Sequence, residues 1–470
     1  MSVSPDRRSV RHGDEFIITC IAYGSQQITF RWLKNDILIN VTKATREMSI
    51  IDSPNHLLDH FTSILTVKSA DALDSGLYTC QAIDWGAQHC KSVKLDVIAA
   101  PSVKVAPLTA SIQKGQALNI ICTWSLMNDG TKSIYGYSWL KERKDTSEAH
   151  LFKMREESEV WEDLQPVGSI LRVYNIQKST RYTCQVQSNA EPVEASVDVE
   201  VLNKSAIPWC ESDDTGLGGV RWAEIGAWGA AKVECPARYA GVATRLCSVS
   251  APGRAVWLTP DYSDCISEDL SRLAENFKKL TLGYGSTTGA YTMSKIYELL
   301  RDRSRLYPGE GETYLTLMQD IAWYLNFTMA WKDLLQSTST FYNTINVILQ
   351  HSNSIINSQK LIDLQKLVNH WTIAWAKHSR INRASVQSYD SLMIHTYCFN
   401  SSSTKLEYTF DISGNIRGYQ SWSRTAVNIL VARESLVVHG STYSIAIIIY
   451  KDLMKYLPER QIYKMDLWAQ

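Results

Sequence analysis

Apolar and polar positions alternate along the first hundred residues, as they do in strands that bury one face. Phe16-Ile17-Ile18-Thr19-Cys20 and Leu65-Thr66-Val67 are two such runs, with turn residues between runs. Short segments with a period of two predict antiparallel strands. After Ala99-Ala100-Pro101 the pattern starts again. We therefore expect two consecutive all-β sandwiches, at residues 1–98 and 101–202.

The periodicity becomes helical after Cys265. Ser267 is a candidate N-cap, and Leu270, Leu273, Phe277 and Leu280 fall on one stripe. Similar helical stretches are Ile296–Leu300, Tyr314–Leu325, Phe341–Leu349 and Leu361–Trp375. Strand patterns return from about Tyr389, at Met393–Cys398, Leu406–Ile412, Ala426–Ala432 and Ile445–Tyr450. We expect an α-helical segment at 267–385 and a β-rich segment at 386–470.

Composition narrows the class of protein. The 470 residues are 45% hydrophobic and carry 48 basic and 48 acidic side chains. The chain therefore has no net charge that would attract it to nucleic acid or to a membrane surface. A chain of this length predicts about three domains. The ten cysteines include no CxxC pair. Disulfide bonds in an extracellular protein are the simplest interpretation.

The cysteines of the first sandwich occur in a specific pattern. Trp32 follows Cys20 by 12 residues, and Asp74-Ser75-Gly76-Leu77-Tyr78-Thr79-Cys80 completes it. This is the immunoglobulin arrangement, in which a disulfide between strands B and F packs on a strand C tryptophan. We expect Cys20 to pair with Cys80, Trp32 to lie on that bridge, and Tyr78 to form the tyrosine corner.

A divergent second copy follows. Cys122, Trp139, Tyr182 and Cys184 occur in the same order, which predicts a Cys122–Cys184 bridge and a second immunoglobulin-like domain. Ser179-Thr180-Arg181 replaces the aspartate and glycine of the first copy. Trp124 competes with Trp139 for the core position, so the sequence leaves that assignment open.

Four further cysteines, Cys210, Cys235, Cys247 and Cys265, are separated by 25, 12 and 18 positions and interleaved with tryptophans. A segment this small usually needs covalent or metal crosslinks. Structural zinc sites supply ligands in close pairs, which these spacings lack, so disulfides are favoured over zinc. Four cysteines permit three connectivities.

The string WC…GGVRW…A…ECP…G…RLC…W…PDYSDC closely resembles the hormone-receptor domain of adhesion G-protein-coupled receptors. The resemblance implies an extracellular module at 208–266, pairs Cys210 with Cys247 and Cys235 with Cys265, and places Trp222 and Trp257 in its core. The order of the segments also resembles that family. There, a hormone-receptor module is followed by the GAIN domain, which consists of helices and then strands. TAVNILVARESLVVHGSTYSIAIIIYKDLMKYLP is similar to the strands that precede its GPS cleavage motif.

The family's cleavage tripeptide and final strands do not follow Tyr450, and the chain ends at Gln470. We therefore expect no self-cleavage and a GAIN-like β subdomain that stops before the GPS motif. Residues 1–15 lack a signal-peptide core, and no run approaches the length of a membrane span. We expect the chain to be a fragment of a longer precursor.

The remaining motifs are glycosylation sequons, a glycine-rich stretch, a charge cluster and two further cysteines. Sequons for N-glycosylation begin at Asn40, Asn203, Asn326 and Asn400. The glycine-rich stretch 283–289 follows a helix and is interpreted as a flexible connector. The cluster 301–305 alternates in charge, which is typical of a solvated face. Cys90 and Cys398 have no assigned partner. Cys90 follows Cys80 by ten residues, and a bond to a segment upstream of this sequence is one interpretation of it; a buried free thiol is the alternative, and is the interpretation favoured for Cys398.

Together these features predict a multidomain extracellular fragment of an adhesion G-protein-coupled receptor. Its role would be ligand recognition and adhesion, and control of signalling by a seven-helix domain that is absent from this chain. We expect contact with the membrane only through that missing domain. A secreted, soluble immunoglobulin-domain binding protein is the alternative. We expect an extracellular or cell-surface protein ligand, no nucleic acid, no cofactor, no metal and no catalytic residues, because no nucleophile, base and orienting group occur together.

Overall fold

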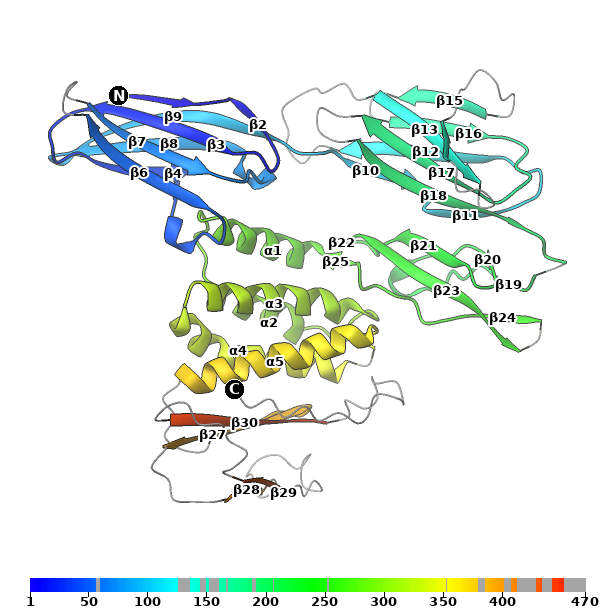
Figure 1. The fold of residues 1–470 in the computed structure, drawn as a ribbon. Helices are drawn as coiled ribbons and strands as arrows, with labels where there is room; N and C mark the ends of the chain where they lie inside the picture. Colours follow the sequence, from blue (N-terminus) through cyan, green and yellow to red (C-terminus); the bar gives the residue numbers. More distant parts are fainter. Residues whose placement is uncertain are drawn as a thin grey trace. The chain divides into compact units, whose positions relative to one another are not determined.

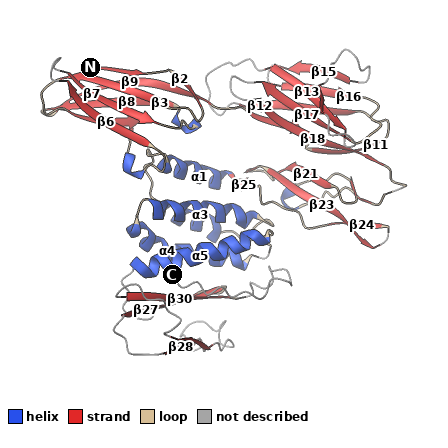
Figure 2. Cartoon of the chain, viewed as in Figure 1, coloured by secondary structure: helices blue, strands red, loops and turns tan. Residues whose placement is uncertain are grey.

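The structure is a computed structural model. It describes residues 1–55, 60–125, 136–143, 149–151, 160–165, 168–187, 192–205, 207–251, 253–351, 353–378, 385–400, 407–411, 428–432 and 442–451. The chain divides into two compact units, residues 1–268 with 275–286, and residues 269–274 with 287–470. Strands dominate the first unit and helices gather in the second (Figure 2).

Residues 2–98 form a sandwich of two sheets (Figure 1). One sheet has the order β1-β3-β7-β6 and the other β2-β9-β8-β4-β5. Their strands are β1 Ser2–Pro5, β2 Ser9–Arg11, β3 Phe16–Tyr23, β4 Thr29–Lys34, β5 Ile37–Leu38, β6 Met48–Asn55, β7 His60–Val67, β8 Gly76–Asp84 and β9 Ala87–Ile98. The predicted alternation holds in β3, where Phe16, Ile18 and Cys20 are buried and the residues between them are partly exposed.

The second sandwich repeats this arrangement with sheets β10-β12-β16-β15 and β11-β18-β17-β13-β14. Its strands are β10 Ser102–Ala106, β11 Thr109–Gln113, β12 Leu118–Ser125, β13 Gly136–Arg143, β14 Ala149–Leu151, β15 Val160–Gln165, β16 Gly168–Val173, β17 Thr180–Gln187 and β18 Val193–Leu202. A separate hydrophobic core that includes Ile120, Leu171 and Val197 fills it. The two predicted β-sandwiches are therefore present as distinct folding units.

A small module with short strands follows the second sandwich. Its strands are β19 Trp209–Cys210, β20 Ile225–Gly226, β21 Ala230–Glu234, β22 Tyr239–Ala240, β23 Val242–Ala251, β24 Arg254–Trp257 and β25 Ile266–Ser267. β21, β23 and β24 form one sheet, and the other strands pair two by two. Trp222 and Tyr262 are fully buried between them. Such limited sheet structure explains the need for disulfides.

The helical prediction is confirmed. The helices are α1 Glu268–Thr281, α2 Gly289–Arg301, α3 Glu310–Phe327, α4 Trp331–Gln350 and α5 Ser358–His378. In the second unit Phe341 of α4 stacks on Trp371 of α5, with ring centroids 4.2 Å apart. Among the helices that the structure describes, none has the length and apolar character required to cross a membrane.

Strands follow the helices as the pattern predicted. They are β26 Ser385–Ser388, β27 Leu392–Asn400, β28 Glu407–Asp411, β29 Asn428–Ala432 and β30 Thr442–Tyr450. β27 pairs with β30 in antiparallel register from Leu392 opposite Tyr450 to Asn400 opposite Thr442. The expected end of the β subdomain, beyond residue 451, lies outside the described residues.

Two interpretations of the linking segments are wrong. The supposed flexible connector is closely packed, with Tyr284 only 3% exposed. In the cluster 301–305, Arg303 does not face only water, since its Nη1 donates to Oε1 of the buried Glu310 at 2.8 Å. Local sequence gave no sign of either contact, because in both cases the partner lies outside the motif.

Candidate functional site

The structure contains the four expected disulfides. Cα atoms are 6.4 Å apart in Cys20–Cys80, 6.3 Å in Cys122–Cys184, 5.9 Å in Cys210–Cys247 and 5.8 Å in Cys235–Cys265. All four separations suit a disulfide. Cys90 is an exposed free thiol, so its interpretation as a buried one is wrong. The side chain of Cys398 lies outside the described residues.

The core markers of the first sandwich take their expected positions. Trp32 is 1% exposed, and its Nε1 donates to Ser63 Oγ at 2.9 Å. The Tyr78 hydroxyl donates to the backbone carbonyl of Asp74 at 3.0 Å, which is the tyrosine-corner contact. Burial raises the pKa of Tyr78, so its hydroxyl stays a donor.

In the second sandwich Trp139, not Trp124, occupies the core. Trp139 is 2% exposed, lies opposite Cys184 in the sheet, and donates to Ser169 Oγ at 3.0 Å. Trp124 is only partly buried. Tyr182 is also buried.

An arginine lies beside two tryptophan rings in the third module. The Arg245 guanidinium is 5.8 Å from the Trp222 ring and 5.1 Å from the Trp257 ring, and its Nη1 donates to Asp213 Oδ2 at 2.6 Å. Hydrogen bonds from the Thr215 side chain, then from Arg245, lower the pKa of Asp213 to about 2. Trp222 is fully buried, as expected for a core residue. Trp257 is only partly buried, so the expectation that it lies in the core is wrong.

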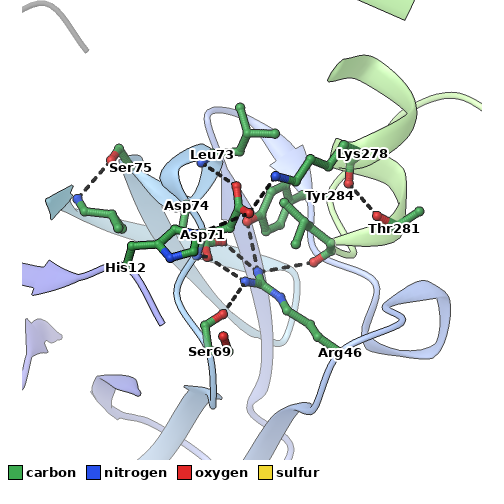
Figure 3. Close-up of polar contacts among 12 residues, drawn as sticks. His12, Arg46, Ser69, Asp71, Leu73, Asp74, Ser75, Lys278, Thr281 and Tyr284 are labelled. Atoms are coloured by element: carbon green, nitrogen blue, oxygen red, sulfur yellow. Dashed lines mark hydrogen bonds and ion pairs between the residues drawn. The ribbon is translucent and has the colours of Figure 1, made fainter. Parts of the chain in front are cut away.

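An extended polar cluster lies within the first unit, where residues 278–284 meet the first sandwich (Figure 3). Arg46 precedes β6 and forms a bidentate ion pair with Asp74, its Nη2 lying 2.7 Å from Asp74 Oδ1. Asp74 is fully buried. A buried ion pair persists only when further hydrogen bonds satisfy its remaining groups.

Further bonds come from both sides of the contact, and among the described residues only Nε of the guanidinium is left without a partner. Arg46 Nη1 donates to the Ser69 carbonyl at 3.1 Å, and Nη2 lies 2.9 Å from the Tyr284 hydroxyl and 3.4 Å from the Leu282 carbonyl. Leu282 and Tyr284 also belong to the hydrophobic core of the first sandwich. The segment after α1 therefore completes this end of the domain.

A second ion pair flanks the first. Lys278 Nζ lies 2.7 Å from Asp71 Oδ2, and His12 Nε2 lies 3.9 Å from the same oxygen (Figure 3). Burial acts to raise the pKa of Asp71, but hydrogen bonds from Lys278 and from the Leu73 amide outweigh it and hold this pKa below its usual range. The charged carboxylate is thus stabilised by the docked segment.

Lys34 is almost completely buried at the end of β4, with Nζ 4.6 Å from the centre of the Tyr284 ring. Burial lowers its pKa to about 8, as do Lys279 and Arg46, while Asp74 opposes the shift. The aromatic face offsets part of the cost of burying this cation.

Backbone hydrogen bonds fix the register of the contact. The Asn40 amide donates to the Gly283 carbonyl at 2.7 Å, and the Thr45 amide donates to the Thr281 carbonyl at 2.8 Å. Gly283 has φ +94°, and an added Cβ would lie 3.1 Å from the Asn40 carbonyl oxygen. Only glycine adopts this conformation at this distance without strain. We call this contact between 278–284 and the first sandwich the connector docking site.

The predicted glycosylation residues lie apart from one another. Asn40, Asn203 and Asn326 are exposed, and the side chain of Asn400 lies outside the described residues. Asn40 borders the connector docking site through its backbone amide. Within the described part of the chain, no group of three His, Cys, Asp or Glu side chains is placed to hold a metal ion.

Sequence reasoning identified Tyr78 as a core residue but missed Arg46, Lys278 and Tyr284 as members of a site. The local signal was Gly283, since glycine is favoured where two backbones approach closely. The partners of this segment on the first sandwich lie more than 200 positions away, so no local pattern connects them.

The comparisons with known proteins concern the immunoglobulin part. The model of the immunoglobulin domain family matches residues 1–83. The chain is 24% identical over 207 residues to the Gallus gallus cell adhesion molecule DSCAM, covering 43% of this chain and 9% of that protein. It is 24% identical over 215 residues to the Drosophila melanogaster tyrosine-protein phosphatase Lar, covering 44% of this chain and 9% of that one.

A solved structure of the N-terminal eight immunoglobulin domains of DSCAM is similar at 16% identity with a TM-score of 0.29, covering 43% of this chain and 24% of the other. The chain spans less than a tenth of the length of the two curated relatives. The family match, the strands and the disulfides show a β-rich, disulfide-bonded multidomain protein with immunoglobulin-like domains. Those domains are of the kind found in extracellular cell adhesion proteins.

Proposed function

We propose that this chain is the extracellular ligand-recognition and adhesion region of an adhesion G-protein-coupled receptor. The observation that carries the proposal is the order of modules. Two immunoglobulin-like sandwiches precede a small module with two crossed disulfides, and helices and then strands follow. This order agrees with the motif resemblance of residues 208–266.

Binding to a cell-surface protein is the activity that this arrangement supports. The two immunoglobulin-like sandwiches support it, since the chain is similar over part of its length to a cell adhesion molecule. In the part of the chain that the structure describes, we identify no nucleophile with a base and an orienting group. We propose that the chain is not an enzyme and requires no cofactor.

The docking site suggests how recognition reaches the rest of the receptor. Residues 278–284 are held on the first sandwich and lead along the chain directly into α2. Residues 278–284 can be docked on the first sandwich or released from it. A ligand shifts the equilibrium between these two states only as far as it binds one state more tightly than the other. We propose that ligand binding to the first sandwich changes the occupancy of this contact.

The binding proposal is tested with the full chain fused to an added signal peptide and a C-terminal dimerising tag. The secreted protein should bind the surface of intact cells, and trypsin treatment of those cells should abolish the signal. As a matched control, reduction of the disulfides should remove binding. Secreted, oxidised protein that binds trypsin-treated and untreated cells equally contradicts a protein ligand.

Sequencing of the full-length transcript tests the receptor assignment. An in-frame seven-helix region downstream of residue 470 is the expected result. A stop codon with no membrane-spanning region in any transcript contradicts it, and then favours a secreted immunoglobulin-domain binding protein.

A further inference from the structure

Two aromatic side chains form an exposed pair on the last turns of helix α3. This helix is labelled in Figure 1. Trp323 is 55% exposed and Phe327 is 52% exposed, and their rings stack with centroids 5.2 Å apart and planes 20° apart. Met329, just after the helix, is 72% exposed. Apolar side chains that cluster on a surface usually mark a contact.

An asparagine sequon lies in the same turn. Asn326 is exposed, and Asn326-Phe327-Thr328 matches the acceptor pattern. Helical side chains three positions apart are neighbours and lean toward the N-terminus, so the Asn326 carboxamide leans toward Trp323. Phe327 completes the ring pair one turn further along the helix from Trp323. The spacing therefore places the Asn326 side chain beside the Trp323 end of the pair.

The helix ends at Phe327, one residue after Asn326. Thr328 is the C-cap, and its hydroxyl donates to the Tyr324 carbonyl at 2.8 Å. Met329 adopts φ 51°, and its amide donates to the Asn326 carbonyl at 3.2 Å. This turn ends the helix at the sequon and leaves solvent on the side of Asn326.

The sequon at Asn40 offers a contrast. Its side-chain Oδ1 accepts hydrogen bonds from the Thr42 amide at 3.1 Å and the Thr42 hydroxyl at 2.7 Å. Its backbone amide is bound to Gly283. For Asn326 we find no side-chain hydrogen bond among the described residues, so its Nδ2 is available for attachment.

We propose that Asn326 carries an N-linked glycan whose first N-acetylglucosamine packs on the Trp323–Phe327 pair and covers this apolar surface. The inference rests on the proposed extracellular function, because N-glycans are added in the secretory pathway. In the transfer, Nδ2 forms a bond to C1 of a lipid-linked oligosaccharide. The C1–O bond to the lipid pyrophosphate breaks, and the amide loses one proton to the transferase.

The chemistry of the two partners is complementary. Aromatic faces carry negative partial charge, and the C–H groups on one face of a pyranose carry positive partial charge. Rings already stacked in the bare protein need no reorganisation to receive the sugar. The same contact removes two large apolar side chains from water, which favours burial.

The test uses the full chain, secreted with an added signal peptide from cells that make only high-mannose glycans. Glycopeptide mass spectrometry determines which sequons are occupied. An endoglycosidase then trims each glycan to one N-acetylglucosamine. Hydrogen exchange of peptides spanning 318–330 is compared for four trimmed proteins. These are the wild type, Asn326→Gln, the double variant Trp323→Ala with Phe327→Ala, and that double variant combined with Asn326→Gln. Asn203→Gln is the matched loss of another glycan, and Thr328→Ser retains the sequon.

We expect Asn326 to carry a glycan. Trimming that glycan to one N-acetylglucosamine should leave the hydrogen exchange of residues 318–330 unchanged. Asn326→Gln should speed exchange about three- to tenfold, the factor that corresponds to an aromatic contact. Without the two rings, loss of the glycan should have no effect, whereas Asn203→Gln should leave these peptides unchanged in every background.

Three outcomes overturn the inference. An equal effect of Asn326→Gln with and without the rings shows that the sugar does not use them. An unoccupied Asn326 beside an occupied Asn203 refutes the glycan but leaves the extracellular function intact. A secretion-incompetent, unglycosylated chain refutes both.

Discussion

At the scale of single residues, the connector docking site shows how a buried ion pair is stabilised. Asp74 is fully buried, and Arg46 contributes hydrogen bonds beyond those to the carboxylate. Removing either Arg46 or Asp74 leaves the other charge buried and uncompensated, which is strongly destabilising. The Tyr284 hydroxyl is the partner that ties the pair to the connector.

Replacing Tyr284 by Phe should weaken docking without emptying the core. The change removes the hydroxyl next to Arg46 Nη2 and should cost about 1.5–3 kcal/mol, as expected for a hydrogen bond to a charged group. Hydrogen exchange of residues 275–286 should accelerate. Tyr291→Phe is the control, because Tyr291 is 49% exposed. Equal protection in both variants contradicts the role of the hydroxyl.

Lys34 gives a pH dependence at the same site. Its pKa of about 8 in the folded protein is below the usual value of 10.5, so between these pH values the unfolded chain binds more protons. The free energy of unfolding contributed by this group therefore rises as the pH increases from about 8 to 10.5. Asp74, Lys279 and Arg46 are the charges that act on it.

Comparing wild type with Lys34→Met separates this effect from the titration of the tyrosines and lysines that do not act on Lys34, because those groups titrate equally in both proteins. The wild-type protein should gain stability relative to the variant across that pH range in denaturant titrations. A stability difference that stays constant with pH means that Lys34 titrates normally and is solvated.

At the scale of elements, the sequence predicted strands and helices well because their periodicity is local. The predicted stripe on α1 is buried at Leu270, Phe277 and Leu280 but only partly buried at Leu273, and the β3 alternation holds. The segment that follows α1 was misinterpreted. Glycines there suggest freedom, but Gly283 is needed to bring two backbones together. A partner distant in sequence decides such a case, and periodicity carries no information about it.

Replacing Gly283 by Ala tests this element. The positive φ costs about 1–2 kcal/mol for any residue with a Cβ, and the close Asn40 and Ala44 atoms add to it. Gly13→Ala is a matched control, since Gly13 has φ +89° but no atom within 4 Å of an added Cβ. Exchange of 275–286 should rise only in the Gly283 variant. Equal effects of both changes contradict the close approach.

At the scale of the whole molecule, the cysteines made the modules predictable. Spacing and tryptophans located both sandwiches, and the motif resemblance implied the pairing in 208–266 that the structure contains. The association of 275–286 with the first unit could not be predicted, because it joins parts separated by the second sandwich and the third module. Recognition of modules is thus possible from local motifs, whereas their contacts depend on tertiary structure.

The modules should therefore lose stability independently, as multidomain chains commonly do. Replacing Cys210 and Cys247 together by Ser opens a link with a sequence separation of 37 residues and should destabilise the third module by about 4 kcal/mol. Its core contains few other buried side chains, so this loss should unfold it. The first sandwich has its own disulfide and core and should remain protected. Peptide-resolved hydrogen exchange distinguishes the cases: fast exchange confined to 207–267 is expected, and loss of protection in 16–98 as well contradicts independent modules.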